Sequence, residues 1–157
     1  RVHLICDTQY ELPIAFKVTP ANKGESTIAK HLIDNLTEQQ ADRGEYLMAD
    51  RGYNGKPLID KIERRSMTAL IDNRHMWQDG DRTRQYKETD LIYDEDGNVS
   101  YVDDFGKAIP LKYAGYDRST DSLRYKFHTK YNDRRIFRIK RSENVRIFPK
   151  VARTSHK

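Results

Sequence analysis

The chain has 157 residues, enough for one domain with a hydrophobic core, and only one of them is a cysteine. It contains no apolar run of 18 residues and no signal-peptide pattern, so the sequence predicts neither a membrane span nor secretion. Cys6 alone can form neither an internal disulfide nor a multi-cysteine zinc site, and we expect a reducing, cytoplasmic environment.

The net charge of +5 is spread unevenly along the chain. Residues 122–157 hold twelve Lys or Arg and two acids, a charge of +10, which leaves −5 for the 17 basic and 22 acidic residues before them. A basic end on an acidic body is typical of proteins that contact a polyanion such as nucleic acid. A solvated, poorly ordered end of the chain explains the same pattern equally well.

The first third of the chain predicts a hairpin followed by a helix. Residues 2–6 and 12–18 alternate in hydrophobicity as strands do, and they are predicted to pair antiparallel. Loop residues follow, and a helix capped by Ser26 or Thr27 is expected to run to about Gln40, because apolar residues recur there at spacings of three and four.

A strand-helix-strand unit comes next. Residues 45–49 and 67–71 are predicted strands, and the helix between them starts near Pro57, a residue suited to the first helical turn. Two strands joined through a helix are expected to lie parallel, with a right-handed crossover. The first half of the chain is therefore predicted to be α/β.

The second half has no helical periodicity and no internal repeat, and it predicts a β-rich region. A hairpin with a Gly turn is expected at Asp94-Glu95-Asp96-Gly97-Asn98, and residues 109–113 and 123–128 are further candidate strands. We expect three regions in all: an incomplete α/β core over 1–75, a β-rich insertion over 76–130 and a basic segment over 131–157.

Asp50 is the sharpest candidate for chemistry. It follows the apolar strand that ends at Ala49 and precedes a Gly-containing turn into a helix. Reactive groups collect at the carboxyl ends of strands in open parallel sheets, and a carboxylate there can hold Mg²⁺, although position alone favours a turn or capping role. A catalytic Asp50 should be exposed in a cleft and free to receive metal, whereas a structural one should be capped by backbone N–H groups or by Arg51 or Arg74.

Other acidic residues could contribute to a metal site. Asp7 and Asp72 also end apolar strands and could converge with Asp50 on a pair of ions, although each suits a solvated turn as well. Glu25 opens a helix, where its charge suits the helix dipole. The five histidines are scattered without metal-ligand spacing, and neither a phosphate-binding loop nor a nucleophile elbow occurs.

Several blocks of the sequence together resemble the DDE transposases of bacterial insertion sequences. The most specific block is Ala49-Asp50-Arg51-Gly52-Tyr53. The supporting blocks are residues 2–7, 11–16 and 18–22, with residues 93–99, 113–116 and 123–126 similar to the β insertion of one branch of that family. The resemblance implies a ribonuclease-H-like mixed sheet with flanking helices, incomplete in this chain, plus a β-rich insertion.

The family pattern assigns one catalytic residue to this chain. The family's second aspartate ends a core strand and is followed by Arg or Lys, Gly and Tyr, which places it at Asp50. Its first aspartate lies on the strand that precedes the one beginning here, so we expect it upstream of Arg1, and Asp7 is then not catalytic. The family often has Asp where this chain has Glu25, and that departure weakens any catalytic role for Glu25.

The family's third acid is a glutamate on a helix, within a Tyr-x₂-Arg-x₃-Glu-x₆-Lys pattern. Tyr131 and Arg134 match the beginning of that pattern, but Arg138 and Val145 stand where the glutamate and the lysine should be. We therefore expect the glutamate beyond Lys157, and we expect the chain to be a piece of a longer protein that is inactive by itself.

The resemblance implies metal-dependent cleavage and transfer of DNA strands, with Mg²⁺ or Mn²⁺, two ions in the full-length enzyme, held by three carboxylates. Asp50 would be the catalytic and metal-binding residue of this chain, and the implied partner is DNA at the ends of an insertion sequence, in the bacterial cytoplasm in association with the nucleoid. No membrane is implied, and a homodimer of the full-length protein stays open. The residues expected to contact DNA phosphates are Arg51, Lys126, Lys130, Arg134, Arg135, Arg138, Lys140 and Arg141.

Two other functions stay open at this point. The chain could be a degenerate transposase remnant that acts only as a nucleic-acid-binding or interaction module. It could also be a ribonuclease-H-like nuclease unrelated to transposition, but the insertion between Asp72 and Lys130 argues against that. Trp77 could stack on an unpaired base, although a packed Trp at the boundary of an insertion is more common.

Overall fold

The computed structural model describes residues 1–151, which form two compact units that divide after Asp72. Helices and strands alternate in the first unit, while the second is built from strands and short 3-10 turns. The α/β class predicted from the sequence is confirmed. Over the described part of the chain, no helix combines the length and apolar character needed to cross a membrane.

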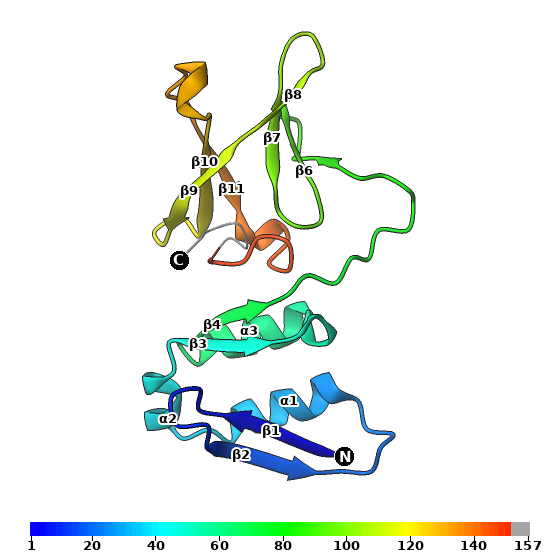
Figure 1. Ribbon diagram of the computed structural model, residues 1–157, viewed down its shortest axis with the longest axis vertical. Helices are drawn as coiled ribbons and strands as arrows, with labels where there is room; N and C mark the ends of the chain where they lie inside the picture. The colour runs from blue at the N-terminus through cyan, green and yellow to red at the C-terminus, as the bar shows by residue number, and fades with distance from the viewer. Residues whose placement is uncertain (152–157) are drawn as a thin grey trace. The chain divides into compact units, whose positions relative to one another are not determined.

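Two strand pairs and three α-helices make up the first unit (Figure 1). β1 and β2 pair antiparallel, and β3 and β4 pair parallel on either side of α3, as the sequence predicts. The elements are β1 Val2–Cys6, β2 Pro13–Val18, α1 Glu25–Asp34, α2 Glu38–Arg43, β3 Tyr46–Ala49, η1 Arg51–Tyr53, α3 Lys56–Arg64 and β4 Thr68–Ile71.

The predicted single helix up to Gln40 is interrupted. α1 ends at Asp34, and α2 begins separately after Thr37. The Thr37 hydroxyl accepts the Gln40 N–H at 3.2 Å, and the Gln40 side-chain oxygen accepts the Thr37 N–H at 2.9 Å. This reciprocal capping box satisfies two backbone donors at a new helix start, and it outweighs the apolar periodicity that favoured one continuous helix.

The sequence predicts one mixed sheet over residues 2–72, but the structure has two separate strand pairs there. No ladder joins β1 to β3 within the described residues. The helices pack beneath both pairs through nearly fully buried side chains: Ile28, Leu32 and Ile33 of α1, and Leu58, Ile59 and Ile62 of α3. The first unit therefore has a common helical layer under a sheet that is interrupted between β1 and β3.

The second unit contains two antiparallel sheets. β5 to β8 form a meander in chain order, and β10 lies between β9 and β11. No helix longer than a single 3-10 turn occurs in the described part of this unit, as the sequence predicts. The elements are β5 Arg84–Gln85, β6 Leu91–Tyr93, β7 Val99–Val102, β8 Ala108–Pro110, β9 Lys112–Asp117, β10 Ser122–Lys126, η2 Thr129–Tyr131, β11 Ile136–Lys140 and η3 Arg141–Glu143.

An aromatic-rich core joins the two sheets of the second unit. Val99, Leu123, Ile139 and Phe148 are each at most 1% exposed. Rings pack edge-on around them, and the Tyr93 and Phe148 ring centroids lie 5.1 Å apart. The sequence predicts a β insertion over 76–130 and a separate basic segment over 131–157. In the structure, β11 of that segment pairs with β10 of the insertion, and Phe148 lies in the core cluster that both share.

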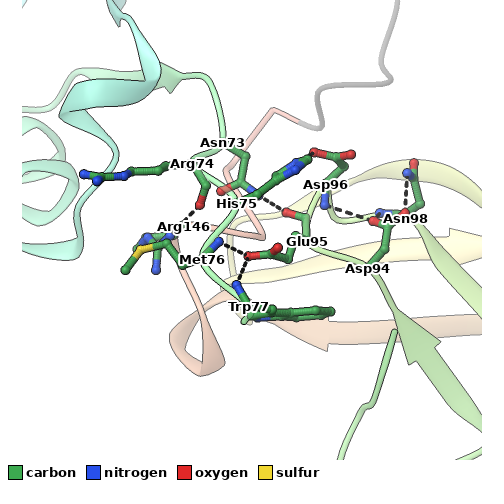
Figure 2. A network of polar contacts seen from close by, with 10 residues as sticks. All are labelled: Asn73, Arg74, His75, Met76, Trp77, Asp94, Glu95, Asp96, Asn98 and Arg146. Carbon is green, nitrogen blue, oxygen red and sulfur yellow. Dashed lines mark hydrogen bonds and ion pairs between the residues drawn. The ribbon is translucent and has the colours of Figure 1, made fainter. Parts of the chain in front are cut away.

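The segment that opens the second unit is tied to the β6–β7 turn (Figure 2). The Glu95 carboxylate accepts the N–H groups of Met76 and Trp77 at 2.6 and 3.1 Å. The His75 Nε2 lies 2.8 Å from the Asp96 Oδ1. Three polar contacts from consecutive residues hold this segment to the turn.

Candidate active site

Asp50 lies where β3 ends, and its conformation is fixed by the turn that follows. Its backbone is extended, with φ −71° and ψ 171°, and it is the N-cap of η1. The Asp50 Oδ1 accepts the Gly52 N–H at 2.7 Å. A Cβ at position 52 would lie 2.9 Å from that same oxygen, so a glycine there permits the close approach of the carboxylate to the backbone.

The Asp50 carboxylate meets part of the expectation for a catalytic group. The side chain is exposed, and its second oxygen, Oδ2, has no hydrogen bond or ion pair within residues 1–151. Arg51 does not cap it. The Gly52 N–H does cap Oδ1, which is the feature expected of a structural aspartate, so one oxygen is engaged and the other is available to a ligand.

A tyrosine lies beside this carboxylate. The pKa of Tyr53 is raised above its ordinary value, first by burial and then by the negative charges of Glu25 and Asp50. Glu25 itself forms an ion pair with Arg1, with the guanidinium nitrogen 2.8 Å from the Glu25 Oε1. Glu25 is the first residue of α1, where its charge suits the helix dipole, and the ion pair with Arg1 is a second structural contact. Tyr53 belongs to the Ala49–Tyr53 block, but the sequence assigns it no role beside Asp50.

A groove of about 570 Å³ opens between β1 and β3. Its walls include consecutive residues of both strands, 3–6 and 46–49, so that the unpaired edges of β1 and β3 face the same space. Ala29, Leu32 and Ile33 of α1 form part of its floor. Asp50 is not part of the lining, so the predicted cleft position of its carboxylate is not seen, although the residues on both sides of it, Ala49 and Tyr53, do line the groove.

The other acidic candidates do not join Asp50. The Asp7 Oδ1 accepts the N–H groups of Gln9 and Tyr10 at 2.8 and 2.9 Å, which is a local turn. Within residues 1–151, no three His, Cys, Asp or Glu side chains are grouped so that they could hold a metal ion. The convergence of Asp7 and Asp72 with Asp50 is therefore not observed, and Asp50 offers one carboxylate ligand rather than a complete metal centre.

The basic residues predicted to contact DNA have different surroundings. Arg51, Lys126, Lys130, Arg134, Arg138 and Lys140 are exposed. Arg135 is also exposed, but it forms an ion pair with Asp133 at 2.8 Å and lies over three aromatic rings.

The prediction that Arg141 contacts DNA phosphates is wrong. Arg141 is 2% exposed, and it donates hydrogen bonds to the Phe148 carbonyl and to the Asp121 carboxylate, both at 3.0 Å. Its guanidinium is enclosed by the fold and cannot reach a phosphate. Nothing in this run of basic residues distinguishes Arg141 as the one that would be buried.

Most aromatic rings near the basic residues face the core, whereas Tyr131 is 43% exposed. Tyr125, Phe127 and Phe148 are buried, and Phe137 packs against the same cluster. Trp77 is packed as well, because its ring meets Tyr93 edge-on and the Arg84 guanidinium lies 4.4 Å from its centre. Base stacking by the buried rings of Tyr125, Phe127 and Phe148 would require the core to open.

Comparison with known proteins gave one family. The family model described as "Transposase DDE domain" matches residues 1–147. Neither the curated proteins nor the solved structures gave a significant match.

Proposed function

This chain belongs to the transposase DDE domain family, and we propose that it is part of a metal-dependent transposase that cuts and joins DNA strands, with Asp50 as one of its metal-binding carboxylates. The observation that carries the proposal is the place of Asp50 at the carboxyl end of a parallel strand, with one carboxylate oxygen uncommitted. Bacterial origin, an insertion-sequence source and DNA ends as the substrate belong to the same proposal.

The chemistry of Asp50 suits Mg²⁺ or Mn²⁺, which prefer oxygen ligands. Its Oδ2 would hold the ion, while the Gly52 N–H on Oδ1 fixes the direction of the carboxylate. When bound, such ions activate a water or a 3′-hydroxyl and stabilise the leaving oxygen. One carboxylate gives weak affinity, so we expect two ions to bind only when further acidic residues stand beside Asp50.

The groove between β1 and β3 supports the proposal that a further strand lies between them. Two facing strand edges leave backbone N–H and C=O groups without ladder partners, and one extended strand placed between them would satisfy both. β1 and β3 run in opposite directions (Figure 1), so the added strand could lie parallel to β3 and end near Asp50. A carboxylate at its end would then be a second metal ligand.

An exposed apolar face also supports further chain around this unit. Leu4, Phe16, Val18 and Met48 are each at least 55% exposed. Apolar patches of this kind are usually covered by another element or partner. We propose that the helix with the third acid, the glutamate expected beyond Lys157, covers this face.

The remaining expectations belong to this proposal. We propose a cytoplasmic protein associated with the nucleoid, with an α/β core over 1–75, an insertion over 76–130 and a basic segment over 131–157. Contact with DNA phosphates is proposed for Arg51, Lys126, Lys130, Arg134, Arg135, Arg138 and Lys140, without Arg141. A homodimer of the full-length protein stays an open alternative.

A degenerate, non-catalytic remnant is the second candidate function. The observation that favours it is the hydrogen bond from Gly52 to Asp50, because it gives the carboxylate a purely structural explanation. Such a remnant would bind nucleic acid through its basic residues without cleaving it.

Asp50→Asn separates the two functions. The amide oxygen of Asn can still accept the Gly52 N–H, so the turn is kept while the charged metal ligand is lost. In the full-length protein, we expect DNA strand cleavage to fall by about 10³-fold or more, since a metal contributes several kcal/mol to stabilising the transition state. Folding and DNA binding should persist.

Asp7→Asn is the matched control, because Asp7 also ends a strand and caps a turn through Oδ1. This variant should cleave like the unmodified protein in Mg²⁺ or Mn²⁺. Near-normal cleavage by Asp50→Asn would rule out the assignment of Asp50, and equal losses in both variants would show a structural effect.

A further inference from the structure

The three-stranded sheet β9-β10-β11 has one face in the core and one face toward solvent. In β10, Leu123 and Tyr125 point inward and are 1% and 3% exposed. Since side chains alternate along a strand, Arg124 and Lys126 lie on the opposite face.

The same alternation applies to the two neighbouring strands. In β11, Ile139 is fully buried, which places Arg138 and Lys140 on the outer face. In β9, Lys112 lies directly across from Lys126 and shares its face. We call the resulting set the basic sheet face: Lys112, Arg124, Lys126, Arg138 and Lys140.

Like charges face each other across this sheet. Arg124 is the direct partner of Arg138, and Lys126 is the direct partner of Lys112. Like charges in directly opposed positions destabilise a sheet. Their Cβ atoms are about 5 Å apart, which is within the Debye length of about 8 Å at physiological salt, so salt does not remove the repulsion.

One negative group lies on this sheet, and it pairs with a single cation of the basic sheet face. Asp117 is the single acidic residue in the three strands. Its Oδ2 lies 3.9 Å from the Arg138 Nε, the outer limit of an ion pair, while its Oδ1 accepts hydrogen bonds from the backbone N–H and the hydroxyl of Ser119. Arg124 is half-buried, and its Nε is enclosed without a hydrogen-bond partner within the described residues.

The chemistry of the face favours a duplex phosphate backbone over a single strand. Proteins that bind single strands present aromatic rings on which bases stack. Here, Tyr125 is buried, and Tyr113, Tyr116 and Phe137 pack against the core, so the aromatic rings of these strands are turned away from the basic sheet face. The outer side of these strands is mainly cationic, with the exposed Ile136 on the same side of β11 as Arg138, and such a surface suits phosphates and reads no base.

We propose that the basic sheet face binds the phosphate backbone of duplex DNA without sequence preference, and that the bound phosphates relieve the repulsion between its opposed cations. This inference rests on the proposed function, because it gives a transposase a defined surface for its substrate. The basic sheet face is thereby assigned a role that the other basic residues of the chain do not share.

The test measures binding of the full-length protein to a fluorescent duplex of unrelated sequence, over a range of salt concentrations. We use Arg124→Gln/Arg138→Gln, which removes one opposed pair, and Lys112→Gln/Lys126→Gln, which removes the other. Each double variant should lower the salt slope, d log K/d log[salt], by about 1.8 in magnitude, and affinity at 0.15 M salt should fall by about 30-fold. Arg82→Gln/Lys107→Gln, a pair of exposed cations outside the face, should change both quantities much less.

Stability supplies an independent readout. Because each substitution removes a repulsive pair, the melting temperature of both double variants without DNA should stay the same or rise. A lower melting temperature together with weaker binding would indicate a structural role for these cations and would overturn the proposal. Unchanged binding, or a loss equal to that of the control pair, would overturn it as well.

Two further comparisons fix the partner and separate this inference from the proposed function. A single-stranded oligonucleotide, a duplex RNA or an acidic polypeptide that binds more tightly than duplex DNA, and with the same dependence on the two pairs, would overturn duplex DNA as the ligand. Asp50→Asn should bind the duplex with an unchanged salt slope. Loss of binding in the face variants alone, and loss of cleavage in Asp50→Asn alone, would therefore support the two proposals separately.

Discussion

The two units of this chain differ in their cores: the second has an enclosed aromatic cluster, while the first has a groove between two strand pairs. In the second unit, two sheets close over a core in which Phe148 is 1% exposed, and even the buried Arg141 has its hydrogen-bond partners inside the fold. In the first unit, β1 and β3 turn unpaired edges toward a groove, and Phe16 is 69% exposed. The second unit encloses a core within the described residues, while the first presents the groove and the apolar face at which we propose that the remaining parts of a catalytic centre assemble.

This difference suggests a division of labour. The first unit holds both the Asp50 carboxylate, with its uncommitted oxygen, and the groove, and we propose that its chemistry depends on a strand that joins it there. The second unit holds the basic sheet face, at which we propose that DNA binds. Each of the following experiments tests a part of this comparison.

The largest effect should come from truncating one phenylalanine in each unit. Phe148→Ala removes a fully buried ring and should lower the free energy of unfolding of the second unit by about 3–5 kcal/mol. Phe16→Ala in the same 157-residue chain should change that of the first unit by less than about 0.5 kcal/mol. Urea unfolding followed by Trp77 fluorescence and by far-UV circular dichroism gives both values, and comparable losses would contradict the contrast.

Hydrogen exchange should show where the first unit is open. Amides of β1 and β3 that face the groove lack ladder partners in this chain and should exchange at least about 100-fold faster than in the full-length protein, equivalent to about 2.7 kcal/mol. Amides of β9, β10 and β11 should exchange alike in both. Equal protection of β1 and β3 in the two proteins would mean that no strand enters the groove.

Substitution of two glycines measures how closely the backbone of the second unit is packed. Gly97 and Gly106 both have a left-handed backbone, with φ of +81° and +78°. A Cβ at Gly97 would lie 2.5 Å from the Ile147 carbonyl oxygen, whereas one at Gly106 would meet nothing within 4 Å. Gly106→Ala should cost about 1–2 kcal/mol in unfolding free energy from backbone strain, and Gly97→Ala about 1–3 kcal/mol more from crowding.

The smallest effect concerns the segment that opens the second unit. The hydrogen bond to Asp96 raises the pKa of His75 above its ordinary value of 6.5. A raised pKa means that the contact stabilises the folded state below pH 6.5 and that this stabilisation is lost as the pH rises through the folded pKa. Since both side chains are exposed, the effect on stability should be slight, and an NMR titration is the better measurement.

In that titration, the His75 ring should have a higher pKa in the unmodified chain than in Asp96→Asn, where it should return toward 6.5. The same pKa in both proteins would show that the contact between the segment and the β6–β7 turn does not persist in solution.

The features that could be predicted from the sequence were mostly those that depend on short local patterns. The β1–β2 hairpin, the parallel β3–β4 pair and the Gly turn at residue 97 each follow from signals within a few residues. The helix break at Thr37 was missed because the capping box competes with an apolar periodicity that continues past it.

The features that could not be predicted depend on contacts between residues far apart in the sequence. The burial of Arg141 depends on the Phe148 carbonyl and Asp121, and the opposition of Arg124 to Arg138 depends on strand register. Neither is visible in the order of residues. The absence of any β1–β3 pairing was equally beyond the sequence, since it depends on the relative placement of two strand pairs.

The most direct test of the central claim, that the Asp50 carboxylate holds the metal, is Asp50→Cys in the full-length protein. A thiolate binds Mg²⁺ poorly and softer ions such as Mn²⁺ better. The account predicts that Asp50→Cys does not cleave DNA in Mg²⁺ but recovers measurable cleavage in Mn²⁺, while Asp50→Asn stays inactive in both. Cleavage by Asp50→Cys in Mg²⁺ at the rate of the unmodified protein, or equal activity of the Cys and Asn variants in Mn²⁺, would contradict it.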